Sequence, residues 1–354
     1  MSANKGVMPM LKDRLLDERE SAILRALVYD YIITGKPVGS RSFVQKYQFS
    51  ISPATMRNVM ADLEQLGYLQ QPHSSAGRVP TDKGYRYYVD SLLEKYSSFS
   101  GDVEIKEDIL SREMQFEKLF DSITKMLSNA SKYAGVMLTP APYFAVVKRI
   151  ELIPLDPKDV LVIMVERTGM VFTRRVKISD TLTYDSLYEF SKYLNSELCG
   201  YALQEIKEKV IKELRSGQTQ SSNNLALDIA ELSIVGESNS MLHIDGIENL
   251  LKIPEMIEKD HLNSLLHIIE EKNVLKDILE LAMRLDGIQT MIGNEIESVY
   301  VRGCSIVTSP YKIGNKNVGV IGVLGPTRMD YEKVVPLVDY TGKVVSDLLT
   351  KMSK

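Results

Sequence analysis

Residues 52–81 read SPATMRNVMADLEQLGYLQQPHSSAGRVPT, and this stretch decides the fold of the first part of the chain. Ser52 followed by Pro53 predicts a helix start, because a serine hydroxyl caps the first turn and proline needs no amide partner there. Apolar side chains then recur at helical spacing and Gly67 ends the helix. The predicted buried stripe consists of Met56, Val59, Met60, Leu63 and Leu66.

The residues after Gly67 predict a β-hairpin followed by another helix. Residues 68–71 are typical of a strand, residues 72–77 form a turn-rich loop, and residues 78–80 begin the returning strand. Gly77 is expected to let the loop backbone lie close to a nucleic acid duplex. Thr81 is expected to cap a helix that contains Tyr85, Tyr88, Val89, Leu92 and Leu93.

Two further helices are predicted before residue 52. Asp17, with Glu20 three residues later, is typical of a capping box that opens a helix ending near Thr34. Gly35 and Pro37 stop that helix. Ser40 is expected to cap a short second helix with an apolar face of Phe43, Val44 and Tyr47.

This order of elements predicts a winged helix-turn-helix in residues 1–95, with the helix after Ser52 as the recognition helix and the hairpin as the wing. Small or hydrogen-bonding residues outside the buried stripe are candidates for contacts to base edges: Ala54, Thr55, Arg57 and Asn58. Candidates for phosphate contacts are Ser40, Arg41, Ser42, Ser52, Ser74, Ser75 and Arg78. The alternative is a small helical domain whose third helix merely packs.

Length and charge favour a modular protein with a DNA-binding head. The chain has 354 residues, enough for two or three domains with separate cores. Residues 1–90 contain 12 Lys+Arg and 9 Asp+Glu, a net charge of +3, while the remainder carries −7. No apolar run reaches the length of a membrane span and no signal peptide is evident, so a cytoplasmic location is expected.

The rest of the chain predicts an α+β domain interrupted by a mainly helical insertion. Three strands are expected at residues 143–155, 160–166 and 170–178, followed by helical stretches at 184–236 and 247–285. Strands return at 305–309 and 319–324, and a helix at 331–349 closes the chain. This order, in which strands are followed by a helical block and then by further strands, predicts an α+β domain with an insertion.

The sequence supports no catalytic, metal or cofactor site. Gly314 and Gly319 have the spacing of a phosphate loop, but Val320 stands where lysine is required. The four histidines are not spaced three or four residues apart, and Cys199 and Cys304 fit buried free thiols better than a disulfide or a zinc site. We therefore expect no enzyme activity and no cofactor.

Several motifs resemble the heat-inducible transcription repressor HrcA family. They are TGKPVGS at 34–40, SPATMRN at 52–58, LEQLGY at 63–68, SSAGRVPT at 74–81 and GVLGPTRMDY at 322–331. The resemblance implies a GAF-like domain split by a dimerisation insert. On the basis of this resemblance, the expected domains are a winged helix at 1–95, a GAF-like domain at 96–180 and 288–354, and an insert at 181–287.

The resemblance also implies a function and its partners. It implies a homodimer that binds a CIRCE-type inverted repeat in double-stranded DNA, represses chaperone operons, is relieved by heat and is kept active by the chaperonin. The chaperonin would recognise exposed apolar surface, for which residues 160–165 and 318–324 are candidate strands. One alternative is a regulator that responds to a small effector bound in the GAF-like domain, and a more distant one is an enzyme fused to a DNA-binding head.

Overall fold

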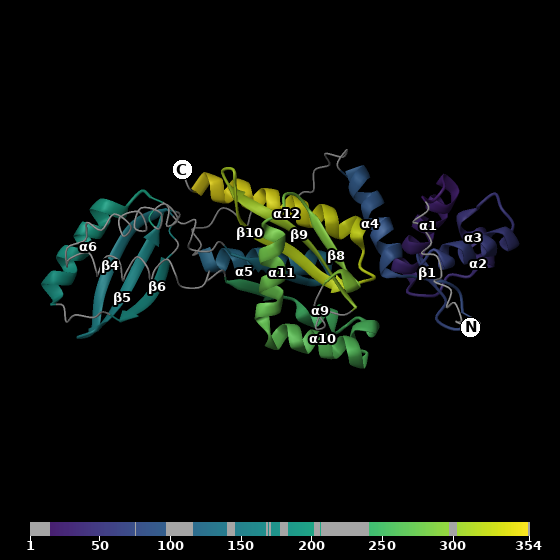
Figure 1. Ribbon diagram of the computed structural model, residues 1–354. Helices are drawn as coiled ribbons and strands as arrows, with labels where there is room; N and C mark the ends of the chain where they lie inside the picture. Colours follow the sequence, from purple (N-terminus) through teal and green to yellow (C-terminus); the bar gives the residue numbers. More distant parts are fainter. Residues whose placement is uncertain are drawn as a thin grey trace, which may run out of the picture. The chain divides into compact units, whose positions relative to one another are not determined.

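The structure, a computed structural model, describes residues 15–74, 76–96, 116–139, 146–167, 169, 171–177, 183–201, 206, 241–296 and 303–352 (Figure 1). Helices combine with antiparallel sheets, as expected for the α+β class. The chain divides into two units. Unit 1 comprises Met1–Asp102, Thr290–Ser305 and Gly325–Val334, and unit 2 comprises Val103–Gln289, Ile306–Leu324 and Val335–Lys354.

Unit 1 begins with a capped helix. In α1 (Glu18–Thr34), the Asp17 carboxylate accepts the amide of Glu20 at 2.7 Å, and Glu20 accepts the amide of Asp17 at 3.0 Å. The predicted capping box is therefore confirmed. Gly35 ends the helix at φ 64°, a left-handed conformation that suits glycine, and its amide donates to the Tyr31 carbonyl.

Two short helices and a two-stranded antiparallel ribbon follow. They are α2 (Ser40–Tyr47), α3 (Pro53–Gln65), β1 (Leu69–Gln70) and β2 (Val79–Pro80), and α4 (Asp82–Tyr96) comes after them. The cap of α2 differs from the prediction. Gly39, whose backbone is extended, is the N-cap residue, and Ser40 is the first residue of the helix. Side chains from α1, α2, α3 and β1 form the core: Ile23, Leu24, Leu27, Val28, Phe43, Met56, Leu63 and Leu69.

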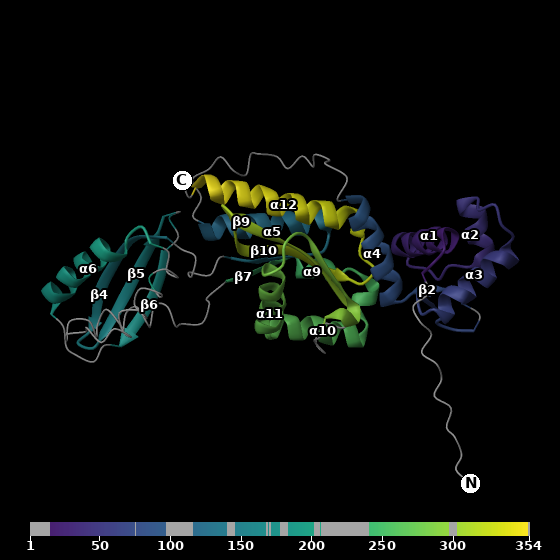
Figure 2. The same ribbon diagram turned by 45° about the horizontal axis from the view of Figure 1, so that its top comes forward.

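A five-stranded sheet has the order β7-β3-β10-β9-β8. Its strands are β3 (Ala134–Leu138), β7 (Leu242–Asp245), β8 (Gln289–Ile292), β9 (Cys304–Ile313) and β10 (Lys316–Pro326). Helices α5 (Phe116–Ser131) and α12 (Tyr331–Met352) lie on one side, and α10 (Lys259–Glu270) and α11 (Lys272–Met283) lie on the other (Figure 2). The short elements α9 (Ile247–Leu250), η3 (Pro254–Ile257) and η4 (Gly293–Glu295) complete the connections.

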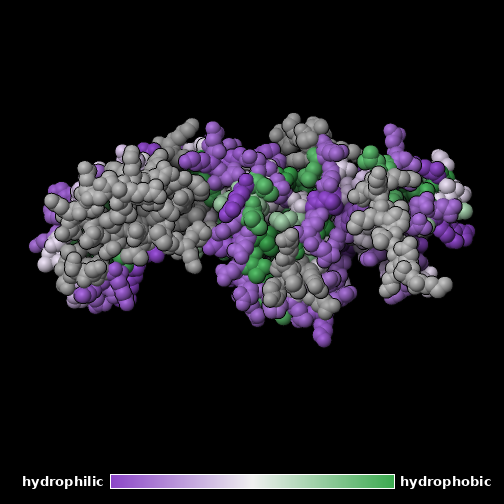
Figure 3. Space-filling view, viewed as in Figure 1, coloured by the Kyte–Doolittle hydropathy of each residue, from purple (hydrophilic) through white to green (hydrophobic). Residues whose placement is uncertain are grey.

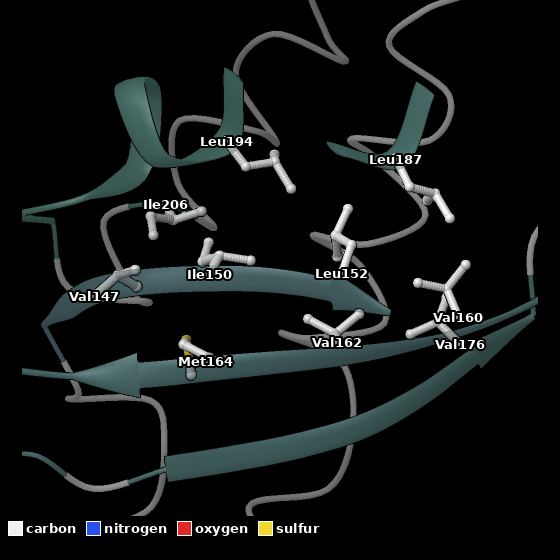
Figure 4. Packing of buried hydrophobic residues seen from close by; sticks show 10 residues of the cluster. All are labelled: Val147, Ile150, Leu152, Val160, Val162, Met164, Val176, Leu187, Leu194 and Ile206. Atoms are coloured by element: carbon white, nitrogen blue, oxygen red, sulfur yellow. The ribbon is translucent and has the colours of Figure 1, made fainter. Parts of the chain in front are cut away.

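A separate sheet contains the three strands expected in the first part of the GAF-like domain. They are β4 (Val147–Asp156), β5 (Asp159–Glu166) and β6 (Val171–Lys177), and α6 (Tyr184–Leu198) packs on them. A buried apolar cluster fills the space between α6 and this sheet (Figure 4). These strands therefore do not pair with β9 and β10, in contrast to the layout expected from the order of elements.

The pairing of β3 with β7 shows where the chain leaves the larger sheet. Leu138 lies opposite Leu242, and the amide of Thr139 donates to the Met241 carbonyl at 3.0 Å. Residues 139–241 thus leave one strand and return to its neighbour, and β4, β5, β6 and α6 lie within this excursion. The bounds expected for the insert, 181–287, differ from those of this excursion, because β4 to β6 precede residue 181 and β7 and α9 to α11 follow the return. Where the insert lies stays a prediction.

Of the two strands expected to offer exposed apolar surface, β10 is buried in the folded chain, whereas β5 is buried on one face only. Val318, Val320, Ile321, Val323 and Leu324 of β10 are at most 2% exposed, and β10 lies at the centre of its sheet. Strand β5 is also the central strand of its sheet. Within the described residues, no helix is long and apolar enough to cross a membrane.

Candidate nucleic-acid interface

Helix α3 separates a buried apolar side from an exposed polar one. Ser52 caps it, since the Ser52 hydroxyl accepts the amide of Thr55 at 3.1 Å, and Pro53 lies in the first turn. Met56, Met60 and Leu63 are buried, as predicted, while Val59 and Leu66 are only partly buried. The predicted base-contacting residues are exposed or partly exposed near the start of the helix: Ala54, Thr55, Arg57 and Asn58.

The start of α2 carries an exposed positive charge. Arg41 is exposed and forms no ion pair with another described residue. The hydroxyl of Ser42 donates to the Gly39 carbonyl at 3.1 Å, so its proton is already used, and Ser40 is partly buried. Of the three residues predicted to contact phosphate here, Arg41 is the most suitable, because it offers an unpaired positive charge.

The far end of α2 is tied to α1 through a buried carboxylate. Asp30 accepts hydrogen bonds from the Lys46 ammonium and from the Tyr47 hydroxyl, the latter at 3.1 Å. Burial, together with the hydrogen bond and charge of Asp30, raises the pKa of Tyr47 to about 12. The charge of Lys46 is therefore balanced within the fold, and it is a poor candidate for a phosphate contact.

The hairpin is fixed by contacts that the sequence did not reveal. Val38, in the turn between α1 and α2, exchanges two backbone hydrogen bonds with Arg78, at 2.8 and 2.9 Å. The Nε atom of Arg78 also lies 2.8 Å from a carboxylate oxygen of Glu64 on α3, and the Arg78 side chain is only 18% exposed. The Arg78 charge is thus balanced by Glu64 within the fold, and the contact with phosphate that the sequence suggested stays a prediction.

Gly77 has a different role from the one expected. A Cβ atom at Gly77 would lie 2.4 Å from the Val38 carbonyl oxygen, far inside normal contact distance. The residue therefore must be glycine because the turn at Val38 passes so close to it, and this reason does not involve a duplex. Ser74 is exposed at the hairpin loop, and its carbonyl accepts a hydrogen bond from the side-chain amide of Gln71. Ser75 lies outside the described residues.

Sequence reasoning missed Lys36 as a candidate for phosphate contact. Lys36 lies in the exposed turn between α1 and α2 and forms no ion pair with a described residue. Its place beside the turn that holds the hairpin was not evident from the sequence, since that contact joins residues about forty positions apart.

Polar contacts hold α4 to a later segment of unit 1, residues 290–295. The Arg86 guanidinium donates to both carboxylate oxygens of Glu295 and to the Thr290 carbonyl, and Asp82 accepts the amide of Asn294 at 2.9 Å. Burial opposes the charge of Arg86, but hydrogen bonds and charges from Glu295 and Asp90 outweigh it and raise the pKa of Arg86. These contacts fix the helix that follows the hairpin.

The segment after β10 makes a second set of contacts within unit 1. Arg328 donates from Nη1 to the carbonyl of Ile32 at 2.8 Å, near the end of α1 where helix carbonyls lack partners. The Tyr88 hydroxyl donates to Glu332 at 3.0 Å, and burial followed by the Glu332 charge raises the pKa of Tyr88 strongly. The motif GPTRMDY thus contributes Arg328 to the support of α1.

The described residues contain no group of three or more His, Cys, Asp or Glu side chains suited to a metal ion. Cys304 is fully buried and Cys199 partly buried, and both are free thiols. His73 is exposed in the hairpin loop. The geometry of unit 1 therefore points to its exposed helix face and hairpin as the candidate site.

Comparisons with known proteins agree on one class. A heat-inducible transcription repressor HrcA from Geobacter sulfurreducens is 38% identical over 337 residues, which cover 94% of this chain and 98% of the relative. A protein of the same description from Pelotomaculum thermopropionicum is 34% identical over 340 residues, covering 95% and 98%. The family model of the HrcA protein C terminal domain matches residues 117–335.

A solved structure described as a hypothetical protein at 2.2 Å resolution has a TM-score of 0.63 and 26% identity, over 96% of this chain and 100% of that one. Taken with the exposed helix face, these similarities define the class: the chain is a transcription repressor. More particularly, it belongs to the heat-inducible transcription repressor HrcA family.

Proposed function

We propose that the chain represses transcription by binding an inverted-repeat operator in double-stranded DNA as a homodimer, through a winged helix formed by α1 to α4 with β1 and β2. The observation that carries this proposal is that α3 has a buried apolar side and an exposed polar side. Arg57 and Asn58 are exposed near its N-terminal end, while Met56 and Met60 anchor its opposite side in the core. A recognition helix requires this arrangement, because it must reach base edges without losing its own packing.

The hairpin acts as the wing of this domain. It follows α3 immediately, and the bridge between Val38 and Arg78 holds its base against the turn before α2. Base readout is assigned to Arg57 and Asn58, which present hydrogen-bonding groups suited to guanine and adenine edges. Phosphate contacts are assigned first to Arg41 and Lys36, because their charges are exposed and unpaired among the described residues.

Dimerisation is assigned to the excursion between β3 and β7, which we propose as the insert in place of 181–287. The side of its sheet opposite α6 carries exposed apolar side chains, with Ile153 43% exposed and Val171 56% exposed. Glu151, Thr173 and Arg175 lie on the same side. Ile153 lies opposite Leu161 and Val171 opposite Val165 in the strand register, so these side chains share one face. A second copy placed on this face would bury them and supply the second head that an inverted repeat requires.

The five-stranded sheet with helices on both sides is proposed as the GAF-like domain. We further propose a CIRCE-type operator upstream of chaperone operons, relief of repression by heat and maintenance of the active state by the chaperonin. Membership of the family supports these points. Because β10 is central and covered, the chaperonin would meet it only in partly unfolded chains, whereas one face of β5 is partly exposed in the folded chain.

Footprinting on the chain's own chaperone promoters tests the proposal. Purified protein is expected to protect an inverted repeat, and chaperonin to increase the protected fraction. Arg57→Ala is expected to lose this protection while Lys46→Ala, whose charge is already paired with Asp30, keeps it. Absence of protection by the wild-type chain in the presence of chaperonin would contradict the proposed function.

A further inference from the structure

The end of helix α1 receives its positive charge from a distant part of the chain. Its last turn, which the structure describes in full, contains no basic residue. Carbonyl groups at a helix end lack amide partners and form the negative end of the helix dipole. The Gly35 amide satisfies the Tyr31 carbonyl at 2.8 Å, whereas the Ile32 carbonyl accepts Nη1 of Arg328, 296 positions later, at 2.8 Å. Arg328 therefore supplies the cation that α1 lacks.

The guanidinium of Arg328 also lies flat against Gly35. A Cβ atom at Gly35 would stand 3.2 Å from Cζ of Arg328 and 3.4 Å from each of Nη1 and Nη2. Nearly equal distances to three atoms of one plane place this Cβ position over the face of the guanidinium and not at its edge. Arg328 thus contacts the end of α1 twice, by a hydrogen bond at Ile32 and by packing on Gly35.

The backbone that carries Arg328 is fixed by contacts of its own. Met329 and Tyr331, which follow it, are fully buried. The Tyr331 hydroxyl donates to the Thr327 carbonyl at 2.9 Å, and the Tyr331 ring lies beside Tyr85 of α4, with ring centroids 6.5 Å apart. These contacts do not involve the Arg328 side chain, so its removal is expected to act on the end of α1 and to leave the segment in place.

The turn that begins at Gly35 carries a candidate for phosphate contact. Lys36 follows Gly35 directly and is exposed. Two residues later, the backbone of Val38 is bridged to Arg78 of the hairpin. The visible surface over α2 and α3, to which this turn leads, is mainly hydrophilic, as suits contact with phosphates (Figure 3). Lys36 thus lies between two fixed points, Arg328 before it and the hairpin after it.

We propose that Arg328 is a positioning residue for operator binding, which holds the end of α1 so that Lys36 meets a phosphate. A charged side chain on a loose turn binds less tightly, because the turn must lose conformational freedom when the contact forms. Since Arg328 holds Ile32 and Gly35 in the folded chain, part of that ordering precedes binding. The inference rests on the proposed function and deepens it, because affinity for DNA then depends on the later motif GPTRMDY.

A double-mutant cycle in the full-length chain tests the proposal. Affinity for the footprinted operator fragment is measured by titration at several salt concentrations, with chaperonin present. Arg328→Ala and Lys36→Ala are each expected to weaken binding about tenfold and to lower the salt slope by about one unit. The double variant is expected to bind as tightly as the weaker single variant, because both changes remove one contact. Additive losses, or Lys36→Ala with wild-type affinity, would overturn the proposal, since Arg328 would then act without Lys36.

Lys333→Ala is the matched control for loss of charge. Lys333 lies in the same segment of unit 1, its side chain is 83% exposed, and it pairs with Asp330 at 2.8 Å. The variant removes one positive charge five positions from Arg328, and its affinity and salt slope are expected to equal those of wild type. A loss as large as that of Arg328→Ala would indicate a general effect of charge and would overturn the proposal.

Thermal unfolding separates positioning from a general loss of folding. Arg328→Ala is expected to be fully folded at the temperature of the titration, so that its loss of affinity belongs to the folded chain. If it is not, Arg328→Lys takes its place in the cycle. Lysine keeps a donor for the Ile32 carbonyl, and this variant is expected to bind more tightly than the alanine variant. Loss of affinity only in variants that are partly unfolded would overturn the proposal.

Failure of this inference is distinguishable from failure of the proposed function. If the wild-type chain protects its operator and folded Arg328→Ala binds equally well, the positioning role is wrong and the proposed repressor stands. A wild-type chain that binds no operator overturns both.

Discussion

Replacement of Gly77 by alanine should open the base of the wing. The added methyl group would lie 2.4 Å from the oxygen, 2.5 Å from the carbon and 2.8 Å from the nitrogen of Val38. All three are backbone atoms, so no side-chain rotation relieves the overlap. The chain must separate here by roughly 1 Å to reach an ordinary contact distance.

The expected magnitude follows from the two hydrogen bonds at this point. Separation breaks the bonds between Val38 and Arg78, which measure 2.8 and 2.9 Å. Each is worth about 0.5–1.5 kcal/mol, so the local loss is about 1–3 kcal/mol. That loss corresponds to roughly 5- to 150-fold faster amide hydrogen exchange at the two residues. Operator affinity should fall as well, because the wing loses its fixed position.

Gly39→Ala is the matched control, because it lies on the other side of Val38. A Cβ atom at Gly39 meets only the Ser42 hydroxyl, at 3.5 Å, and its backbone is extended at φ −91°. Exchange at Val38 and Arg78 should therefore stay within about twofold of wild type. The reasoning is refuted if Gly77→Ala leaves the exchange rates unchanged, or if both alanine variants accelerate exchange equally.

Three other outcomes are expected. Arg57→Ala and Asn58→Ala should each lower the preference for operator over random DNA by about 1–3 kcal/mol, measured as a ratio of dissociation constants. An equal loss of affinity for both DNAs would contradict contacts to base edges. Glu64→Gln should destabilise the wing without strengthening binding if Arg78 is structural, whereas a steeper dependence of affinity on salt would show that the freed Arg78 contacts phosphate. Burial raises the pKa of Cys304 to about 12, so the thiol should resist maleimide in the folded chain. Rapid labelling of the folded chain would contradict the burial of this thiol. Since the Cys304 thiol ionises at lower pH in the unfolded chain than in the folded one, it should lower the free energy of unfolding as pH rises above about 9.

Local signals predicted the helices of unit 1 well. The capping box at Asp17 and the cap at Ser52 are properties of adjacent residues, and both are confirmed. The buried row on α3 is confirmed at Met56, Met60 and Leu63, while Val59 and Leu66 are only partly buried. The exposed positions of Arg57 and Asn58 follow from the same helical spacing. Their contact with DNA stays a prediction, because spacing shows which side of a helix is free but not what occupies it.

Contacts between residues that are far apart along the chain could not be predicted from the sequence. The alternating pattern of β5 is the same whether it pairs with β4 or with β9, so the sequence could not indicate that β4, β5 and β6 form a sheet of their own. Strand β7 has only four residues, too few for a clear pattern, and yet it marks where the chain returns. Likewise, nothing near Arg78 in the sequence indicates Val38 or the partly buried Glu64 as its partners.

The interruption between β3 and β7 has a consequence for the newly made chain. Strand β3, with the sequence AGVML, pairs with β7 on one edge and with β10 on the other. On a ribosome that adds about 5–20 residues per second, β3 waits roughly 5–20 s for β7 and about twice as long for β10. Both edges of β3 stay unpaired until β7 is made, and the edge that pairs with β10 stays unpaired for longer. Each new repressor molecule therefore exposes open strand edges while it is being synthesised.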